Sequence, residues 1–145
     1  MTAATADRLS VYAGERGIPL DIDYPMTASA SVYLNCFVNA DSAGNVKDAT
    51  DAASELCVGI ATEGLTCSAT AGSTHAVIRR DVVAEFFINS TDIDVTDIGK
   101  NASVKDNQTV TDAATATNDV RCGVVVDVRN GKAYVHVGVF APSAA

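Results

Sequence analysis

The residues best suited to chemistry in this chain of 145 residues are two histidines. His75 and His136 lie in strand-like runs, and neither has a serine or acidic partner at a recognisable spacing. The residues of a Ser-His-Asp triad can be far apart in sequence, so the missing spacing does not by itself exclude one. However, the G-x-S-x-G nucleophile-elbow motif does not occur either. The glycine-rich phosphate loops and the zinc-binding helix motif are missing as well. The sequence therefore predicts a protein that is not an enzyme, with no catalytic residue and no cofactor.

Metal ligands are also hard to find in the sequence. The acidic stretch 92–97 offers carboxylates to a hard cation, but an EF-hand loop counted from Asp92 needs glycine at Asp97 and glutamate at Ser103. We expect turn carboxylates there instead, with Asp94 as a helix N-cap. The cysteines show no C-x-x-C spacing, and most lie in apolar runs where cysteine behaves as a small buried hydrophobe. They are Cys36, Cys57, Cys67 and Cys122.

The charge balance limits the partners of the chain. Ten Lys and Arg face 18 Asp and Glu, and the net charge of −8 opposes approach to a phosphate backbone. No apolar run reaches 18 residues, and residues 1–10 contain neither a basic nor an apolar stretch typical of a secretory signal. We therefore expect no nucleic-acid partner, no membrane partner and synthesis in the cytoplasm.

The elements that must position any site are predicted to be strands. The apolar residues are largely Ala and Val, there is no Trp, and short β-branched runs alternate with turns at the spacing of a sandwich or barrel. We expect a mostly β, single small barrel or sandwich-like domain with short helical turns near 50–55 and 94–98. The expected strands are 31–34, 36–39, 45–49, 56–61, 74–79, 82–88, 101–105, 109–111, 120–128 and 133–139.

The clearest local prediction is a C-terminal hairpin. Asn130-Gly131 suits both positive-φ positions of a type I′ turn. A two-residue loop pairs Arg129 with Lys132, and counting outward places apolar residues opposite one another on one face, which we expect in the core. The expected pairs on that face are Val128 with Ala133, Val126 with Val135, Val124 with Val137 and Cys122 with Val139.

Residues 1–25 differ in sequence pattern from the β domain that we expect over residues 26–145. They contain scattered Gly and Pro with apolar and aromatic residues but no helical period, which indicates an extended N-terminal arm that gains order from a partner, or a frayed terminus. Arg79 and Arg80 indicate a second contact, with a subunit or partner, or else a solvated turn. The candidate arm contacts are Tyr12, Arg16, Ile18, Leu20, Ile22 and Tyr24.

Six segments of the chain, taken in order, carry a resemblance to a known family: 31–33, 56–61, 97–100, 106–110, 122–125 and 134–137. They resemble the small capsid decoration, or head cement, proteins of tailed bacteriophages. The resemblance covers roughly residues 8 to 140 and preserves the order and approximate spacing of the segments. One departure is Asn35, where the family tends to have glycine; asparagine tolerates the same left-handed backbone.

This resemblance implies a structural virion protein on the outer surface of a phage head, made in the host cytoplasm. It implies that the major capsid protein is the partner, that neighbouring capsid subunits are bridged, and that the protein is a homotrimer. The candidate arm contacts would then touch the capsid. The alternative is a receptor- or carbohydrate-binding β module of a virion fibre or tail, although the chain has only four Tyr, four Phe and no Trp for such a site.

Overall fold

The computed structural model describes residues 2–8 and 12–142, with the backbone alone for residues 12–19. The described chain is mostly β, as predicted, and adds one short 3-10 turn, η1 (Val95–Asp97). The strands are β1 (Tyr12–Pro25), β2 (Ser31–Val32), β3 (Phe37–Ala40), β4 (Val46–Asp48), β5 (Leu56–Ala61), β6 (Leu65–Thr66), β7 (His75–Ile88), β8 (Asn101–Asp106), β9 (Thr109–Asp112), β10 (Arg121–Arg129) and β11 (Lys132–Val137).

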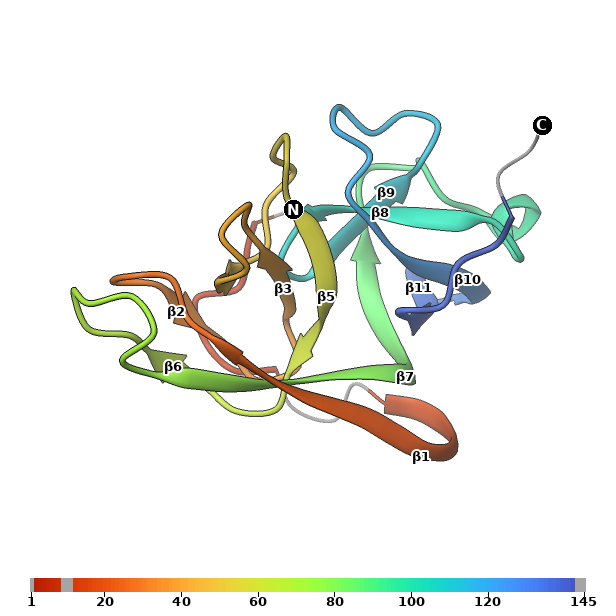
Figure 1. The fold of residues 1–145 in the computed structure, drawn as a ribbon. Helices are drawn as coiled ribbons and strands as arrows, with labels where there is room; N and C mark the ends of the chain where they lie inside the picture. The colour runs from red at the N-terminus through yellow and green to blue at the C-terminus, as the bar shows by residue number, and fades with distance from the viewer. Residues whose placement is uncertain (1, 9–11, 143–145) are drawn as a thin grey trace.

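Five of these strands close into a small barrel (Figure 1). Their order is β11-β10-β8-β9-β7, and pairing between β11 and β7 closes the ring. The β7–β9 pair is parallel, and the other pairs of the barrel are antiparallel. β5, β3 and β4 extend the sheet from β7, β1 pairs with β7, and β2 and β6 form a separate ribbon. Of the two predicted forms, a barrel or a sandwich, the chain therefore adopts the barrel.

The long strand β7 connects the barrel to everything outside it. Sequence patterning predicts two strands here with a turn between them, but the chain continues as one strand through Arg79 and Arg80. Asp81 takes a left-handed φ of 64°, which bends the strand without ending it. The barrel half beyond Asp81 pairs with β11, with β9 and with the first residues of β1, and the half before it pairs with β5 and the rest of β1.

The C-terminal hairpin has the predicted turn but only part of the predicted register. Asn130 and Gly131 have φ of 53° and 73°, and Arg129 pairs with Lys132 as expected. A bulge at Val126 then shifts the register by one residue. The pairs Val126 with Val135, Val124 with Val137 and Cys122 with Val139 are therefore wrong, because the observed pairs are Val125 with Val135, Val124 with His136 and Gly123 with Val137.

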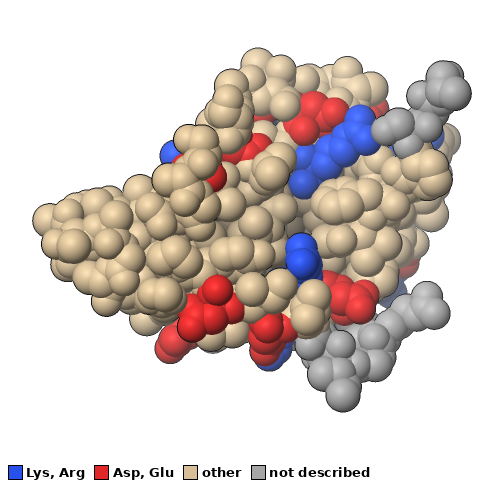
Figure 2. Space-filling view, in the orientation of Figure 1, with Lys and Arg blue, Asp and Glu red and all other residues tan. Residues whose placement is uncertain are grey.

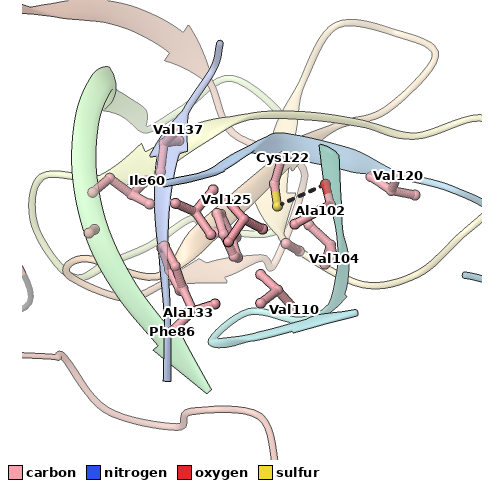
Figure 3. Close-up of a cluster of buried hydrophobic side chains, with 14 of the residues drawn as sticks. Ile60, Phe86, Ala102, Val104, Val110, Val120, Cys122, Val125, Ala133 and Val137 are labelled. Atoms are coloured by element: carbon pink, nitrogen blue, oxygen red, sulfur yellow. Dashed lines mark hydrogen bonds between the residues drawn. The ribbon is translucent and has the colours of Figure 1, made fainter. Parts of the chain in front are cut away.

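Two apolar clusters form the interior. The larger one fills the barrel with small side chains from all five barrel strands and includes Phe86 (Figure 3). The smaller one lies under β2, β3, β4 and the first half of β7, and Met26 is fully buried in it. Such small residues fill thin layers between short strands, as the composition predicts.

Local turn chemistry follows the sequence closely in three places and departs from it in one. Asn35 has a φ of 60°, and the Asp41 carboxylate accepts hydrogen bonds from the backbone N–H groups of Ala43 and Asn45. Asp94 is the N-cap of η1, as expected, and accepts from the Thr96 N–H at 2.8 Å. The helical turn expected near 50–55 is wrong, because that segment contains only bends and turns before β5.

Candidate interaction site

The predicted arm is extended, and from Tyr12 to Pro25 it forms the strand β1 along β7. Its register runs from Pro25 opposite His75 to Tyr12 opposite Ala84, with an irregularity between Glu15 and Leu20. Within the described residues β1 pairs with β7 alone, so its other edge has no strand beside it. In Figure 1 β1 and the first half of β7 form a ribbon below the barrel.

The candidate arm contacts with described side chains are Leu20, Ile22 and Tyr24, which alternate with Asp21 and Asp23 along β1 and so share one face of this ribbon. Leu20, opposite Arg80, is 48% exposed. Ile22 is opposite Ile78 and Tyr24 packs against the smaller apolar cluster, so this pair helps to attach β1 to its own domain. The backbones of Tyr12, Arg16 and Ile18 lie on β1, and their side chains are outside the described part of the structure.

The opposite face of the ribbon carries ion pairs between the strands. Arg79 donates two hydrogen bonds to the Asp21 carboxylate, at 2.8 and 2.9 Å. These bonds hold the pKa of Asp21 below its ordinary value. His75 contacts Asp23 at 2.9 Å from Nδ1 to Oδ1. The two aspartates were not predicted as site residues, because only the β1–β7 register shows that they face Arg79 and His75.

Arg80 lies immediately before the bend of β7 at Asp81. Its side-chain carbons occupy the space that a Cβ on Gly138 would need, at 2.8 Å for the Arg80 Cβ. Beside it, the His136 Nε2 atom lies 2.5 Å from the Asp81 Oδ1 atom. The two arginines are therefore parts of a continuous strand rather than of the solvated turn considered from the sequence, and Arg79 is already paired within the chain.

Residues 2–8, which we call the N-terminal strap, lie against the barrel and β3. The Arg8 guanidinium carbon is 4.8 Å from the centroid of the Phe86 ring, and its nitrogens donate to the carbonyls of Asn35 and Glu85. The Arg8 N–H also donates to the carbonyl of Leu34 at 2.8 Å. No sequence period indicates these contacts, and the strap was not predicted to bind its own domain.

A buried amide forms the floor beneath the strap. Asn107 donates to the carbonyl of Ala4 at 2.9 Å and accepts from the Ala4 N–H at 2.7 Å. The same amide nitrogen lies 2.9 and 3.0 Å from the two carboxylate oxygens of Asp48. Burial raises the pKa of Asp48 to about 6, although the Asn107 hydrogen bond and one from the Ala49 N–H act in the other direction.

The end of the domain formed by β2 and β6 is uncharged. No Lys, Arg, Asp or Glu occurs in segments 27–33 and 65–74, which are rich in Ser, Thr and Ala. We call these two segments the neutral tip; Figure 2 shows this end without charged side chains, while acidic groups gather along the lower edge of the same face. In a chain with a net charge of −8, such an end is a candidate contact, since the centres of protein interfaces are depleted in charge.

The groups that could support catalysis or metal binding do not converge in the described residues. Each imidazole contacts an aspartate, and no described serine, threonine or cysteine hydrogen-bonds to either ring. No group of three His, Cys, Asp or Glu suited to a metal ion occurs in residues 2–8 and 12–142. All four cysteines are free thiols, and burial raises the pKa of Cys36 and of Cys57 to about 12.

Comparison with family models, curated proteins and solved structures gives no match to this chain. Across the part of the chain that the structure describes, no helix has the length and apolar character needed to cross a membrane.

Proposed function

We propose that this chain is a structural virion protein that binds the outer surface of a tailed-phage head and bridges neighbouring major capsid subunits, cementing the shell. The resemblance of its segments to head cement proteins suggests the role. The observation that carries the proposal furthest in the structure is the open edge of β1, a strand of 14 residues with one hydrogen-bonded neighbour among the described strands. An edge of this length offers unpaired backbone groups to a strand of a partner protein.

The side chains near this edge support a contact with protein. Leu20 on β1 and Val77 on β7 are exposed large apolar residues, at 48% and 37%, on opposite faces of the ribbon. Apolar groups beside an open strand edge favour addition of a partner strand, because backbone hydrogen bonds and side-chain burial then act together. Among the candidate capsid contacts whose side chains are described, Leu20 is the most exposed and therefore the best placed to contact a partner.

Trimerisation would strengthen weak contacts of this kind. Three copies around a three-fold axis would present three β1 edges at once, so that dissociation requires all of them to release. The net charge of −8 suits the outside of a shell better than its DNA-filled interior, because the packaged phosphates repel an acidic chain. No catalytic group is needed for this role.

The proposal is tested by cosedimentation with purified heads that lack the protein. Leu20→Glu should weaken binding more than about tenfold, since burying a leucine side chain contributes about 1.5–3 kcal/mol. Leu56→Glu is the matched control, because Leu56 is 73% exposed at the far end of β5 from the β5–β7 contact, and it should leave binding unchanged. Imaging of decorated heads then reports location, symmetry and stoichiometry.

A third variant separates the two candidate surfaces. Thr70→Glu puts a charge on the exposed neutral tip and leaves β1 untouched. If Thr70→Glu abolishes binding while Leu20→Glu does not, the tip meets the shell and the role of the β1 edge is refuted. If the native chain binds no heads but binds glycans on an array, the fibre or tail module is the better assignment.

Deletion of residues 1–24 is not a clean test of the arm. It would remove the strap contacts of Ala4 and Arg8 and the Tyr24 side chain that packs on the smaller cluster. Loss of head binding would then follow from damage to the domain as readily as from loss of a capsid contact. Single exposed substitutions avoid this ambiguity.

A further inference from the structure

The groove that holds the N-terminal strap recognises mainly backbone. Asn107 pairs with both the N–H and the carbonyl of Ala4, and the Gln108 amide donates to the carbonyl of Thr2 at 2.5 Å. Backbone atoms of Leu34 and the Asn35 side chain pair with Arg8 in the same way. A peptide of the strap's sequence, ending in Asp7 and Arg8, therefore satisfies this groove whichever copy of the chain supplies it.

The strap itself is held only at the surface. Thr2, Ala3, Thr5, Ala6 and Asp7 are exposed, and only Ala4 and Arg8 are partly buried. Its exposed residues are already solvated, and among its side chains only that of Arg8 covers a core ring, that of Phe86, so the strap can open locally without global unfolding.

The groove, by contrast, is fixed from below. Asn107 is fully buried, its amide also donates to Asp48, and its backbone carbonyl accepts the Phe37 N–H at 2.8 Å. Without a strap, the Asn107 side-chain oxygen Oδ1 and the Leu34 N–H would lose the partners that the Ala4 N–H and the Asp7 carboxylate now provide. Polar groups at a partly buried site are costly to leave unpaired, so the preformed groove favours occupation.

We propose that the strap of one copy occupies the groove of a second copy, so that neighbouring copies are linked by strap exchange. Every contact described above is kept, and the choice between the chain's own groove and a neighbour's is set by effective concentration. Exchange is then favoured where copies are crowded together. Each copy gives one strap and receives one, so a ring of copies closes with no groove empty. The inference does not depend on binding to a phage head.

Two variants of the full chain, each with one cysteine added to the four native ones, test exchange directly. Thr2→Cys places a thiol on the strap and Gln108→Cys places one on the groove wall beside it, so in a mixture a disulfide between these two positions joins different copies. Under a mild oxidant and at high protein concentration, we expect a linked dimer on a non-reducing gel, several-fold more abundant than in a mixture of Thr2→Cys with Ser42→Cys. Ser42 is exposed and lies in the 41–45 turn, outside the groove.

Two further measurements keep the result interpretable. The first adds Arg8→Ala to the Thr2→Cys chain, which removes the side chain that lies over Phe86 and should abolish the excess dimer. The second is an NMR measurement on a mixture of two chains: a nitroxide attached to Thr2→Cys should broaden the Gln108 side-chain amide signals of an isotopically labelled native chain. Circular dichroism checks that each variant is folded. No excess of dimer together with no broadening, or a dimer yield that Arg8→Ala leaves unchanged, overturns strap exchange.

Discussion

The aromatic rings of Phe37 and Phe86 stack with their centroids 4.0 Å apart and their planes at 14°. Phe37 comes from β3, outside the closed barrel, and Phe86 comes from the barrel half of β7. The Arg8 guanidinium lies over the Phe86 ring. This stack therefore joins three parts of the chain that are distant in sequence, namely the barrel, the strands that extend its sheet, and the strap.

Removal of one ring of this stack should be severe. Phe37 is fully buried, and we expect Phe37→Ala to lower the free energy of unfolding by about 3–5 kcal/mol through lost burial and a cavity. Phe140→Ala is the control, since Phe140 is 50% exposed, and it should change stability by no more than about 0.5 kcal/mol. Urea denaturation measures both, and comparable losses would contradict the central role of the stack.

The bulge in the C-terminal hairpin predicts opposite tolerances at two adjacent valines. Val125 is 1% exposed inside the barrel, and Val126 is 39% exposed. Val125→Asp buries an unpaired carboxylate and should prevent folding at neutral pH, whereas Val126→Asp should cost no more than about 0.5 kcal/mol. Thermal denaturation followed by circular dichroism compares them. A more stable Val125→Asp variant would restore the regular register expected from the sequence.

The sequence could predict the hairpin turn but not this bulge, for a physical reason. Residues 124–126 are all valine, so no alternation of polar and apolar residues shows which of them faces the barrel interior. The register is set instead by a distant segment: the Gly99 N–H donates to the Val125 carbonyl at 2.8 Å, and the Val125 N–H donates to Lys100 at 2.9 Å. Short-range turn chemistry at Asn35 and Asp94 needs no such partner and was predicted.

The candidate site was predictable only in outline. The extended character of residues 12–25 follows from their composition, but pairing such as Leu20 with Arg80 spans the chain and has no local signal. The same is true of the strap, whose Ala4 meets Asn107 across 103 positions of sequence. The pairing of charged side chains, such as Asp21 with Arg79, can be recognised only once the register of β1 against β7 is known.

Gly123 should be almost irreplaceable on β10. A Cβ there would clash with the carbonyl oxygen of His136 and lie 2.9 Å from its carbonyl carbon, and backbone atoms of a paired strand cannot yield as a side chain does. We expect Gly123→Ala to cost about 3 kcal/mol or more in the free energy of unfolding. Gly44→Ala meets no atom within 4 Å but sits at a φ of 83°, so it should cost only about 1–2 kcal/mol. Equal losses in urea denaturation would refute the close approach.

The buried carboxyl of Asp48 gives stability an unusual pH dependence. Its pKa is raised by burial from 3.8 to about 6, so the folded state binds a proton that the unfolded state has lost between these values. Its contribution to stability is therefore present below about pH 4 and is lost as pH rises through about 6. This is the reverse of the usual aspartate, whose pairing lowers its pKa.

Asp48→Asn should remove this dependence, because a neutral amide keeps an acceptor for Asn107 without a charge to bury. We expect the stability of the variant relative to the native chain to rise by about 2 kcal/mol between pH 4 and 7, allowing for partial exposure of the carboxyl. Asp41→Asn is the control. Hydrogen bonds from Asn45 and Ala43 outweigh desolvation and lower the pKa of Asp41. The stability difference between this variant and the native chain should therefore not change between about pH 5 and 7. Urea denaturation across this range measures both differences, and a flat profile for Asp48→Asn would show that the carboxyl beneath the strap is solvated rather than buried.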